Sequence, residues 1–169
     1  MAKNPLVDLV NYADATPEVR EIFDDIMNTR QSDYVNNIWR ALASHPPLLK
    51  QFWSQMKEAM IKPSRLDPLT KELIYLAVSI TNSCTYCINS HTAAARKKGL
   101  DDEILGELNS IVALANAGNR LTDGYQLPVD DMFQSKQLAP KWKYEAKTSS
   151  AASNKVKQRA RYKYCHLYK

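Results

Sequence analysis

The sequence predicts an all-α protein, a single-domain bundle of about six helices that is followed by a basic tail. Signals that begin and end helices are frequent, and no segment clearly alternates apolar and polar residues as a half-buried strand would. Only four glycines are present, all of them after residue 98. We assign the helical domain to residues 1–138 and the tail, which we expect to be disordered, to residues 139–169.

Proline signals and apolar spacing predict the first three helices. Thr16-Pro17 places an N-cap residue before a proline at the first helical position, and apolar residues follow at helical spacing. A second helix is expected over about residues 33–44 and a third over about 47–61. His45 precedes two prolines and is expected to end the second helix, because a residue before proline avoids the α region. Three aromatic residues are interpreted as core or subunit interface: Trp39, Phe52 and Trp53.

The fourth helix is predicted to be the most deeply buried. Asp67-Pro68 repeats the cap-and-proline signal and opens a helix that should run to about Ile80. From Leu73 to Ile80 every residue except Ser79 is apolar or aromatic. A helix of this composition is expected to be buried nearly all round.

Two further helices are expected to complete the domain. Asn82 or Ser83 is predicted to cap the fifth, which should run to about Lys98. Asp101 is predicted to cap the next, whose apolar residues recur at helical spacing, and a short helix is expected before Gly124.

The charge of the chain is divided unevenly. The formal net charge is +5, but residues 136–169 hold ten of the 23 basic residues and one acid, so that segment carries +9 and the rest −4. The tail is interpreted as a solvated extension. Nucleic-acid binding is the alternative, because basic residues interleaved with tyrosines suit phosphates and base stacking. Cys165-His166 lies in the tail and is interpreted as incidental.

Composition also indicates the cellular compartment in which the protein is expected. Hydrophobic residues make up 44% of the chain, which is ordinary for a soluble globular protein. No run of 18 apolar residues occurs, and the N-terminal residues do not form a secretory signal. We therefore expect a cytoplasmic protein without a membrane partner. In that compartment a close cysteine pair is more often redox-active or metal-binding than structural.

Two cysteines, a histidine and a glutamate are the candidate catalytic residues. Cys84, Cys87 and His91 are spaced i, i+3 and i+7, so they share one helical face. Cys84 would lie in the first helical turn, where free backbone N–H groups favour a thiolate. His91 follows Cys87 by one turn and could act as its base. Glu72, on the preceding helix, needs a partner if buried, and His91 is the nearby candidate if the helices pack antiparallel. The arrangement follows the logic of an acid that orients a base that activates a nucleophile.

Other interpretations of these residues remain open. The two cysteines could be small buried hydrophobes, or zinc ligands with His91 and a fourth ligand such as Glu72. Glu72 could instead pair with a lysine or arginine at a subunit contact. Tyr75 and Tyr86 are interpreted as packing residues, although a phenol beside the thiols could donate a hydrogen bond.

The pattern Glu72-x11-Cys84-x2-Cys87-x3-His91 resembles the signature of the alkylhydroperoxidase D-like group within the carboxymuconolactone decarboxylase family. The likeness covers roughly residues 5–132 and nothing in the tail. It includes the segments VNNIWRALASHPPLLKQFW, LDPLTKELIYLAVSITNSCTYCINSHTAAARKKGL and ANAGNRLTDGYQLPVD. The resemblance implies an all-helical domain that assembles as a homotrimer or a higher homo-oligomer.

The resemblance also implies an activity, the reduction of hydroperoxides by the cysteine pair without a bound cofactor. Cys87 would match the cysteine that attacks the peroxide, Cys84 the resolving cysteine, and Glu72 with His91 the proton relay. An external dithiol, lipoyl or thioredoxin-like, would be the reductant. The type enzyme of the group has a histidine just before its second cysteine. Tyr86 stands here instead and is a candidate relay or substrate-contact residue.

Two other classes of function are kept beside the peroxidase. One is a small-molecule enzyme of the carboxymuconolactone decarboxylase type that uses the same pocket, with incidental cysteines. That branch of the family lacks the cysteine pair, which makes lactone decarboxylation the weaker hypothesis. The other is a non-catalytic redox sensor or binding protein whose disulfide changes its partner.

Overall fold

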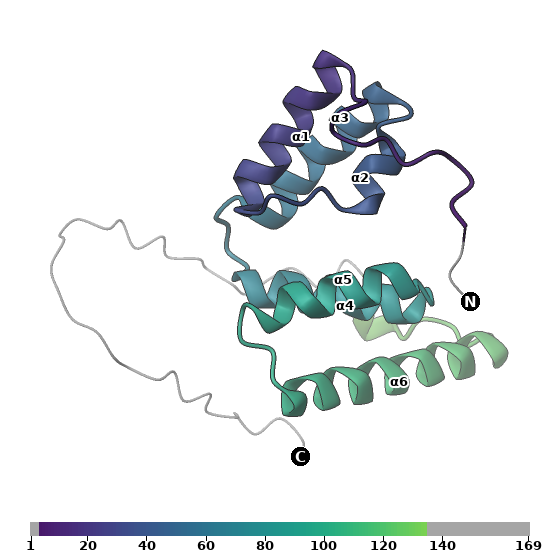
Figure 1. Ribbon diagram of the computed structural model, residues 1–169. Helices are drawn as coiled ribbons and strands as arrows, with labels where there is room; N and C mark the ends of the chain where they lie inside the picture. The colour runs from purple at the N-terminus through teal and green to yellow at the C-terminus, as the bar shows by residue number, and fades with distance from the viewer. Residues whose placement is uncertain (1–3, 135–169) are drawn as a thin grey trace, which may run out of the picture. The chain divides into compact units, whose positions relative to one another are not determined.

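The computed structural model describes residues 4–134, which form helices and no strand (Figure 1). They divide into a unit that ends at Gln126 and a second that begins at Leu127. Six α-helices lie in the first unit, as expected for the all-α class. The second contributes one short 3-10 helix, η2 (Asp131–Phe133). The predicted boundary at residue 138 and the tail 139–169, with Cys165-His166 and its alternative of nucleic-acid binding, lie outside the described residues.

Three helices form the first hydrophobic core: α1 (Pro17–Arg30), α2 (Asn37–Leu42) and α3 (Pro46–Met56). The Thr16 hydroxyl accepts a hydrogen bond from the Val19 N–H at 3.4 Å, which is the predicted N-cap of α1. Trp39 and Trp53 pack edge to face with ring centroids 5.2 Å apart. Both indoles are buried, and Phe52 packs against the same cluster, so the three aromatic residues are core residues as expected.

The region around His45 differs from the prediction. The second helix begins at Asn37 rather than near residue 33, and it ends at Leu42. His45 does not end it but caps α3, because its Nδ1 accepts a hydrogen bond from the Leu48 N–H at 3.3 Å. Prolines at the first two helical positions suit a helix start, since their missing N–H groups would have had no partner there. A π-helix, η1 (Lys57–Ile61), extends α3 to the predicted end of the third helix.

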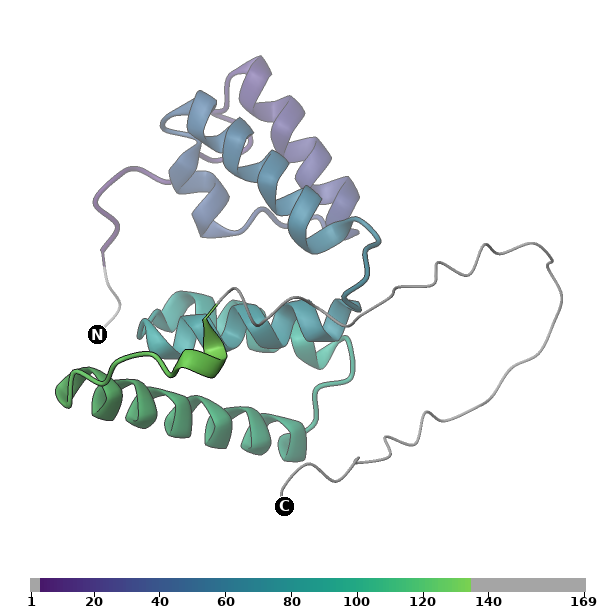
Figure 2. The same ribbon diagram turned by 180° about the vertical axis from the view of Figure 1, so that it is seen from behind.

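The second core lies between α4 (Pro68–Thr81), α5 (Thr85–Arg96) and α6 (Asp102–Gly124). Helix α4 packs against both other helices (Figure 2). The buried residues of this core are Leu76, Ala95 and Leu100. Helix α6 continues to Gly124 in one piece, so the short extra helix expected before that glycine is part of α6.

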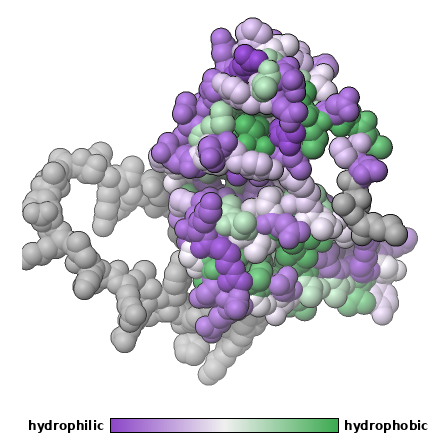
Figure 3. Space-filling model, viewed as in Figure 1, coloured by the Kyte–Doolittle hydropathy of each residue, from purple (hydrophilic) through white to green (hydrophobic). Residues whose placement is uncertain are grey.

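The prediction that α4 is buried nearly all round is wrong for the single chain. Ile74 and Val78 are 50% and 55% exposed, whereas Glu72, Leu76 and Ser79 on the same helix are buried. Helices α5 and α6 cover only part of the circumference of α4, which leaves an apolar face open. Figure 3 shows that hydrophobic surface is also accessible on one side of the molecule. None of the helices described between residues 4 and 134 is long and apolar enough to cross a membrane.

Candidate active site

The two cysteines lie at the start of α5, directly after a tight turn. Helix α4 ends at Thr81, and Ser83 adopts a left-handed conformation with φ +55°. The Cys84 N–H donates to the Ser79 carbonyl at 3.0 Å, which closes the turn. A connection this short between packed helices makes an antiparallel pair. The antiparallel arrangement of α4 and α5, on which the expected site depends, is therefore built by this turn.

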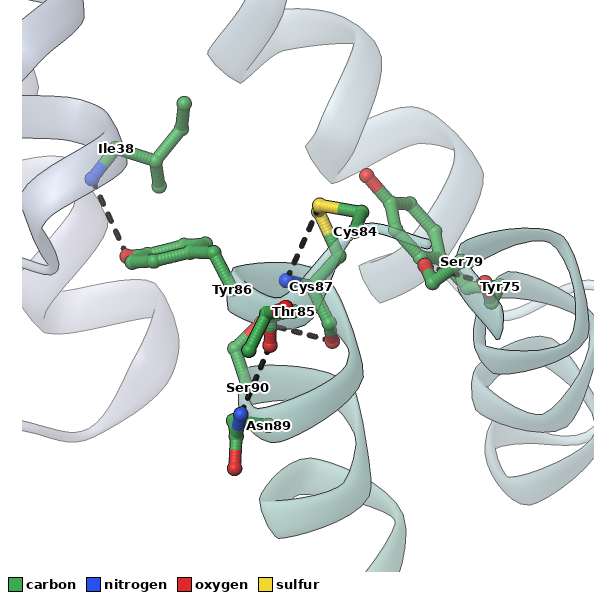
Figure 4. Close-up of a disulfide and its surroundings, with 9 residues drawn as sticks. All are labelled: Ile38, Tyr75, Ser79, Cys84, Thr85, Tyr86, Cys87, Asn89 and Ser90. Atoms are coloured by element: carbon green, nitrogen blue, oxygen red, sulfur yellow. Dashed lines mark hydrogen bonds between the residues drawn. A yellow bond between two sulfur atoms is a disulfide. The ribbon is translucent and has the colours of Figure 1, made fainter. Parts of the chain in front are cut away.

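Cys84 itself caps α5, in place of the predicted Asn82 or Ser83. Its Sγ accepts a hydrogen bond from the Cys87 N–H at 3.3 Å (Figure 4). The structure joins Cys84 and Cys87 in a disulfide, with Cα atoms 5.4 Å apart, within the usual range for such a bond. Both cysteines are only partly buried. In the reduced protein, the free N–H groups and the positive end of the α5 dipole would stabilise a thiolate at Cys84.

Glu72 and His91 are brought into direct contact across the α4–α5 pair. Glu72 is 5% exposed, and its Oε2 lies 2.6 Å from His91 Nδ1. The second carboxylate oxygen, Oε1, accepts a hydrogen bond from Lys98 Nζ. The carboxylate therefore has a cationic partner in its own chain as well as the imidazole. From the sequence, a lysine partner for Glu72 is considered only at a subunit contact, whereas Lys98 belongs to the same chain.

The charge of Glu72 follows from these contacts. Burial raises the pKa of its carboxyl, but the hydrogen bonds from His91 and Lys98, together with their charges, outweigh burial and hold the pKa below its ordinary value of 4.5. Near neutral pH the group is therefore a carboxylate, which can only accept hydrogen bonds. His91 Nδ1 must then carry the proton of the shared hydrogen bond. In the neutral form of the imidazole, Nε2 is then left with a free lone pair, which is the form that a general base requires.

Tyr75 supports the imidazole from the side. Its ring stacks on His91 with centroids 3.7 Å apart and planes inclined by 20°. Because Tyr75 comes from α4, three residues after Glu72, one helical face both hydrogen-bonds and stacks on the same imidazole. The stacking limits rotation of the His91 ring about its side-chain bonds. Tyr75 is thus a packing residue, as expected, and the side chain on which it packs is that of His91.

Tyr86 extends from α5 toward α2 (Figure 4). The Ile38 N–H donates to the Tyr86 hydroxyl at 3.2 Å. This N–H lies in the first turn of α2, where the side chain of the N-cap residue Asn36 caps no backbone N–H. Tyr86 thus satisfies a backbone donor that a helix start leaves without a partner. Its role as a relay or substrate contact stays a prediction.

The residues that were expected as zinc ligands have other bonding partners in the structure. The two sulfurs are bonded to each other, and Glu72 is occupied by His91 and Lys98. Within residues 4–134, no three His, Cys, Asp or Glu side chains are grouped so that they could hold a metal ion.

Comparisons with known proteins identify the family of the chain. A family model described as the carboxymuconolactone decarboxylase family matches residues 47–129. A solved structure, the alkylhydroperoxidase AhpD core of Rhodospirillum rubrum, is 51% identical with a TM-score of 0.74, and the match covers 76% of this chain and 96% of that one. The chain belongs to the carboxymuconolactone decarboxylase family. Within that family it is alkylhydroperoxidase D-like, as the resemblance of the cysteine motif had indicated.

Two curated relatives match shorter segments of this family member. The uncharacterized protein YdfG of Bacillus subtilis is 45% identical over 42 residues, which are 25% of this chain and 29% of YdfG. The uncharacterized protein 4 in the cox locus of Paracoccus denitrificans is 32% identical over 63 residues, 37% of this chain and 57% of that protein. The matched segments thus span less than two thirds of either relative.

Proposed function

We propose that this alkylhydroperoxidase D-like protein is a thiol-dependent peroxidase or disulfide reductase that reduces hydroperoxides through Cys84 and Cys87. The observation that carries the proposal is the contact of a buried carboxylate with His91, one helical turn from a partly exposed cysteine pair. The likeness to the Rhodospirillum rubrum protein supports the same class of chemistry.

In the first half-reaction His91 Nε2 accepts the thiol proton of Cys87, and Glu72 stabilises the imidazolium that forms. The Cys87 thiolate attacks one peroxide oxygen and the O–O bond breaks. The other oxygen leaves with its bonding electrons and takes the proton from His91, so an alcohol is released. Cys87 is oxidised by two electrons to a sulfenic acid, and the peroxide is reduced by two.

In the second half-reaction the Cys84 thiolate attacks the sulfenic sulfur of Cys87. A disulfide forms, and hydroxide leaves and is protonated to water. The bonded Cys84 and Cys87 at the start of α5 correspond to this product. An external dithiol, lipoyl or thioredoxin-like, then attacks the disulfide, passes through a mixed disulfide and leaves oxidised, which returns both cysteines to thiols.

Thiol alkylation tests the proposed function against its alternatives. The reduced protein should turn over cumene hydroperoxide in the presence of dihydrolipoamide or reduced thioredoxin, and iodoacetamide treatment should abolish this activity. A decarboxylase-type activity that survives alkylation would favour the small-molecule enzyme of the same family. Oxidation by a single equivalent of peroxide without turnover, whichever donor is supplied, would favour a redox sensor.

We also propose that the protein assembles as a homotrimer or a higher homo-oligomer. Apolar residues at helical spacing are exposed on α6, where Ile111, Leu114 and Leu121 are more than half accessible. An exposed apolar helix face is typical of an interaction site. Leu114→Glu is expected to lower the molar mass measured by light scattering to that of a monomer, because it places a charge in the interface. Asn109→Glu, an exposed position on the other flank of α6, is the matched control. A parent protein that is already monomeric would contradict the proposed assembly.

A further inference from the structure

Lys98 is held at the Glu72 carboxylate by the backbone that follows α5. The Lys98 N–H donates to the Ala95 carbonyl at 2.9 Å, and the Leu100 N–H donates to the same carbonyl at 3.0 Å. Between them Gly99 adopts φ +103°, a conformation that glycine accepts without strain. Leu100 is buried in the second core. This turn therefore anchors the chain on both sides of Gly99 and directs the Lys98 side chain back toward α4.

The Glu72 carboxylate is shared between a cation and the imidazole. Lys98 Nζ donates to Oε1, and His91 Nδ1 lies against Oε2. The Glu72 side chain is 6% exposed and that of Lys98 is 30% exposed. An ionised carboxylate at so buried a place needs a compensating charge. As long as His91 is neutral and able to act as a base, that charge comes from Lys98.

The other charged groups nearby are engaged elsewhere. Arg96, on the last turn of α5, pairs with Asp102 at the start of α6. Lys71, next to Glu72 on α4, donates to the Lys62 carbonyl at 2.8 Å. The phenol of Tyr75 stacks on the His91 ring. The cysteines at the start of α5 are disulfide-bonded and carry no charge.

We propose that Lys98 is a positioning residue for the proton relay, an inference that rests on the proposed peroxidase function. Its ammonium keeps Glu72 ionised, so that the carboxylate holds the Nδ1–H of His91 and leaves Nε2 free to accept the proton of Cys87. Lys98 touches neither peroxide nor sulfur in this scheme and acts through Glu72. The hydrogen bond from Lys98 Nζ to the buried carboxylate of Glu72 is the observation that distinguishes Lys98 from its basic neighbours.

The test is Lys98→Met, which keeps most of the side-chain length and removes the charge. The Glu72 carboxyl carbon, assigned with Glu72→Gln, is followed by 13C NMR against pH in the oxidised protein. Its titration midpoint is expected to move up by about one pH unit, because an opposite charge at this distance lowers a carboxyl pKa by roughly one to three units. The acidic limb of kcat/KM for cumene hydroperoxide should move in the same direction, with about a tenfold loss at the pH of the shifted limb.

Two further variants and the parent protein complete the test. Lys98→Arg should restore the Glu72 titration and the pH profile, and Lys97→Met, at the exposed neighbouring position, should change neither. An unchanged Glu72 midpoint in Lys98→Met overturns the inference, as does a shifted midpoint with an unchanged pH profile of kcat/KM. Failure of the proposed function appears separately, as absent peroxide turnover in the parent with every dithiol donor.

Discussion

Replacement of Cys87 by serine is expected to lower kcat/KM for an organic hydroperoxide by ~10⁴-fold or more, the scale of loss seen when a catalytic nucleophile is removed. In the proposed cycle the Cys87 sulfur attacks the O–O bond. A serine hydroxyl at that place stays protonated near neutral pH and is a far weaker nucleophile. The measurement is peroxide consumption with dihydrolipoamide as the donor. Turnover by Cys87→Ser at the parent rate would contradict the assignment.

Cys84→Ser separates the two cysteine roles. This variant should consume one equivalent of peroxide and then stop, with a sulfenic acid at Cys87 that dimedone trapping and mass spectrometry identify. Serine is a good N-cap residue, so α5 is expected to begin at the same place. Cys165→Ser, which changes the cysteine of the tail, is the matched control and should keep full turnover. Continued fast turnover by Cys84→Ser would show that Cys84 does not resolve the sulfenic acid.

Glu72→Gln is expected to reduce kcat/KM by about 10²- to 10⁴-fold, the usual contribution of positioned acid–base groups. The amide has no charge with which to stabilise the His91 imidazolium, and it leaves the Lys98 ammonium without its carboxylate. It can also donate a hydrogen bond, which would favour the imidazole tautomer with the proton on Nε2, the wrong form for a base. Glu58→Gln, an exposed carboxyl paired with Lys62, is the matched control and should keep its activity.

The same substitution should change the acid dependence of stability. Because the folded-state pKa of Glu72 lies below the ordinary 4.5, its ionised form stabilises the fold fully above that pH. This contribution is lost as the pH falls through the lower folded-state value. The carboxyl pKa values of Asp25 and Asp67 are also lowered, but these groups act equally in both proteins. Urea unfolding at pH 7 and pH 3 should therefore show a smaller loss on acidification in Glu72→Gln than in the parent. Equal losses would contradict the ionised state of Glu72.

Local chemistry made the starts of α1, α4 and α6 predictable. Thr16, Asp67 and Asp101 were identified as N-caps from sequence, and each side chain accepts a hydrogen bond from the backbone N–H three residues later, at 3.4, 3.0 and 2.7 Å. Such a bond involves only neighbouring residues, so it can be inferred without the fold. The prediction for His45 is wrong because the same proline signal is compatible with the end of one helix and the start of the next.

Contacts between distant segments were less predictable. The pairing of Glu72 with His91 could be anticipated only on the condition that α4 and α5 pack antiparallel, a condition met by the turn at Ser83. The contact of Lys98 with Glu72 spans 26 residues, and that of Tyr86 with Ile38 spans 48. Neither the helical periodicity of the sequence nor its capping patterns indicate which distant residues will contact each other.

By itself, the sequence determined the helical class, the starts of α1, α4 and α6, and the set of cysteines, histidine and glutamate, because these depend on residue type and short spacing. The tertiary structure decided that Cys84 caps α5, that Lys98 completes the charge at Glu72, and that Tyr86 serves α2. It also decided which face of α4 the chain covers, leaving Ile74 and Val78 exposed. The physical reason is that the type of an apolar or charged side chain does not specify which distant residue it will contact. The partner is chosen when the turns bring two helices together.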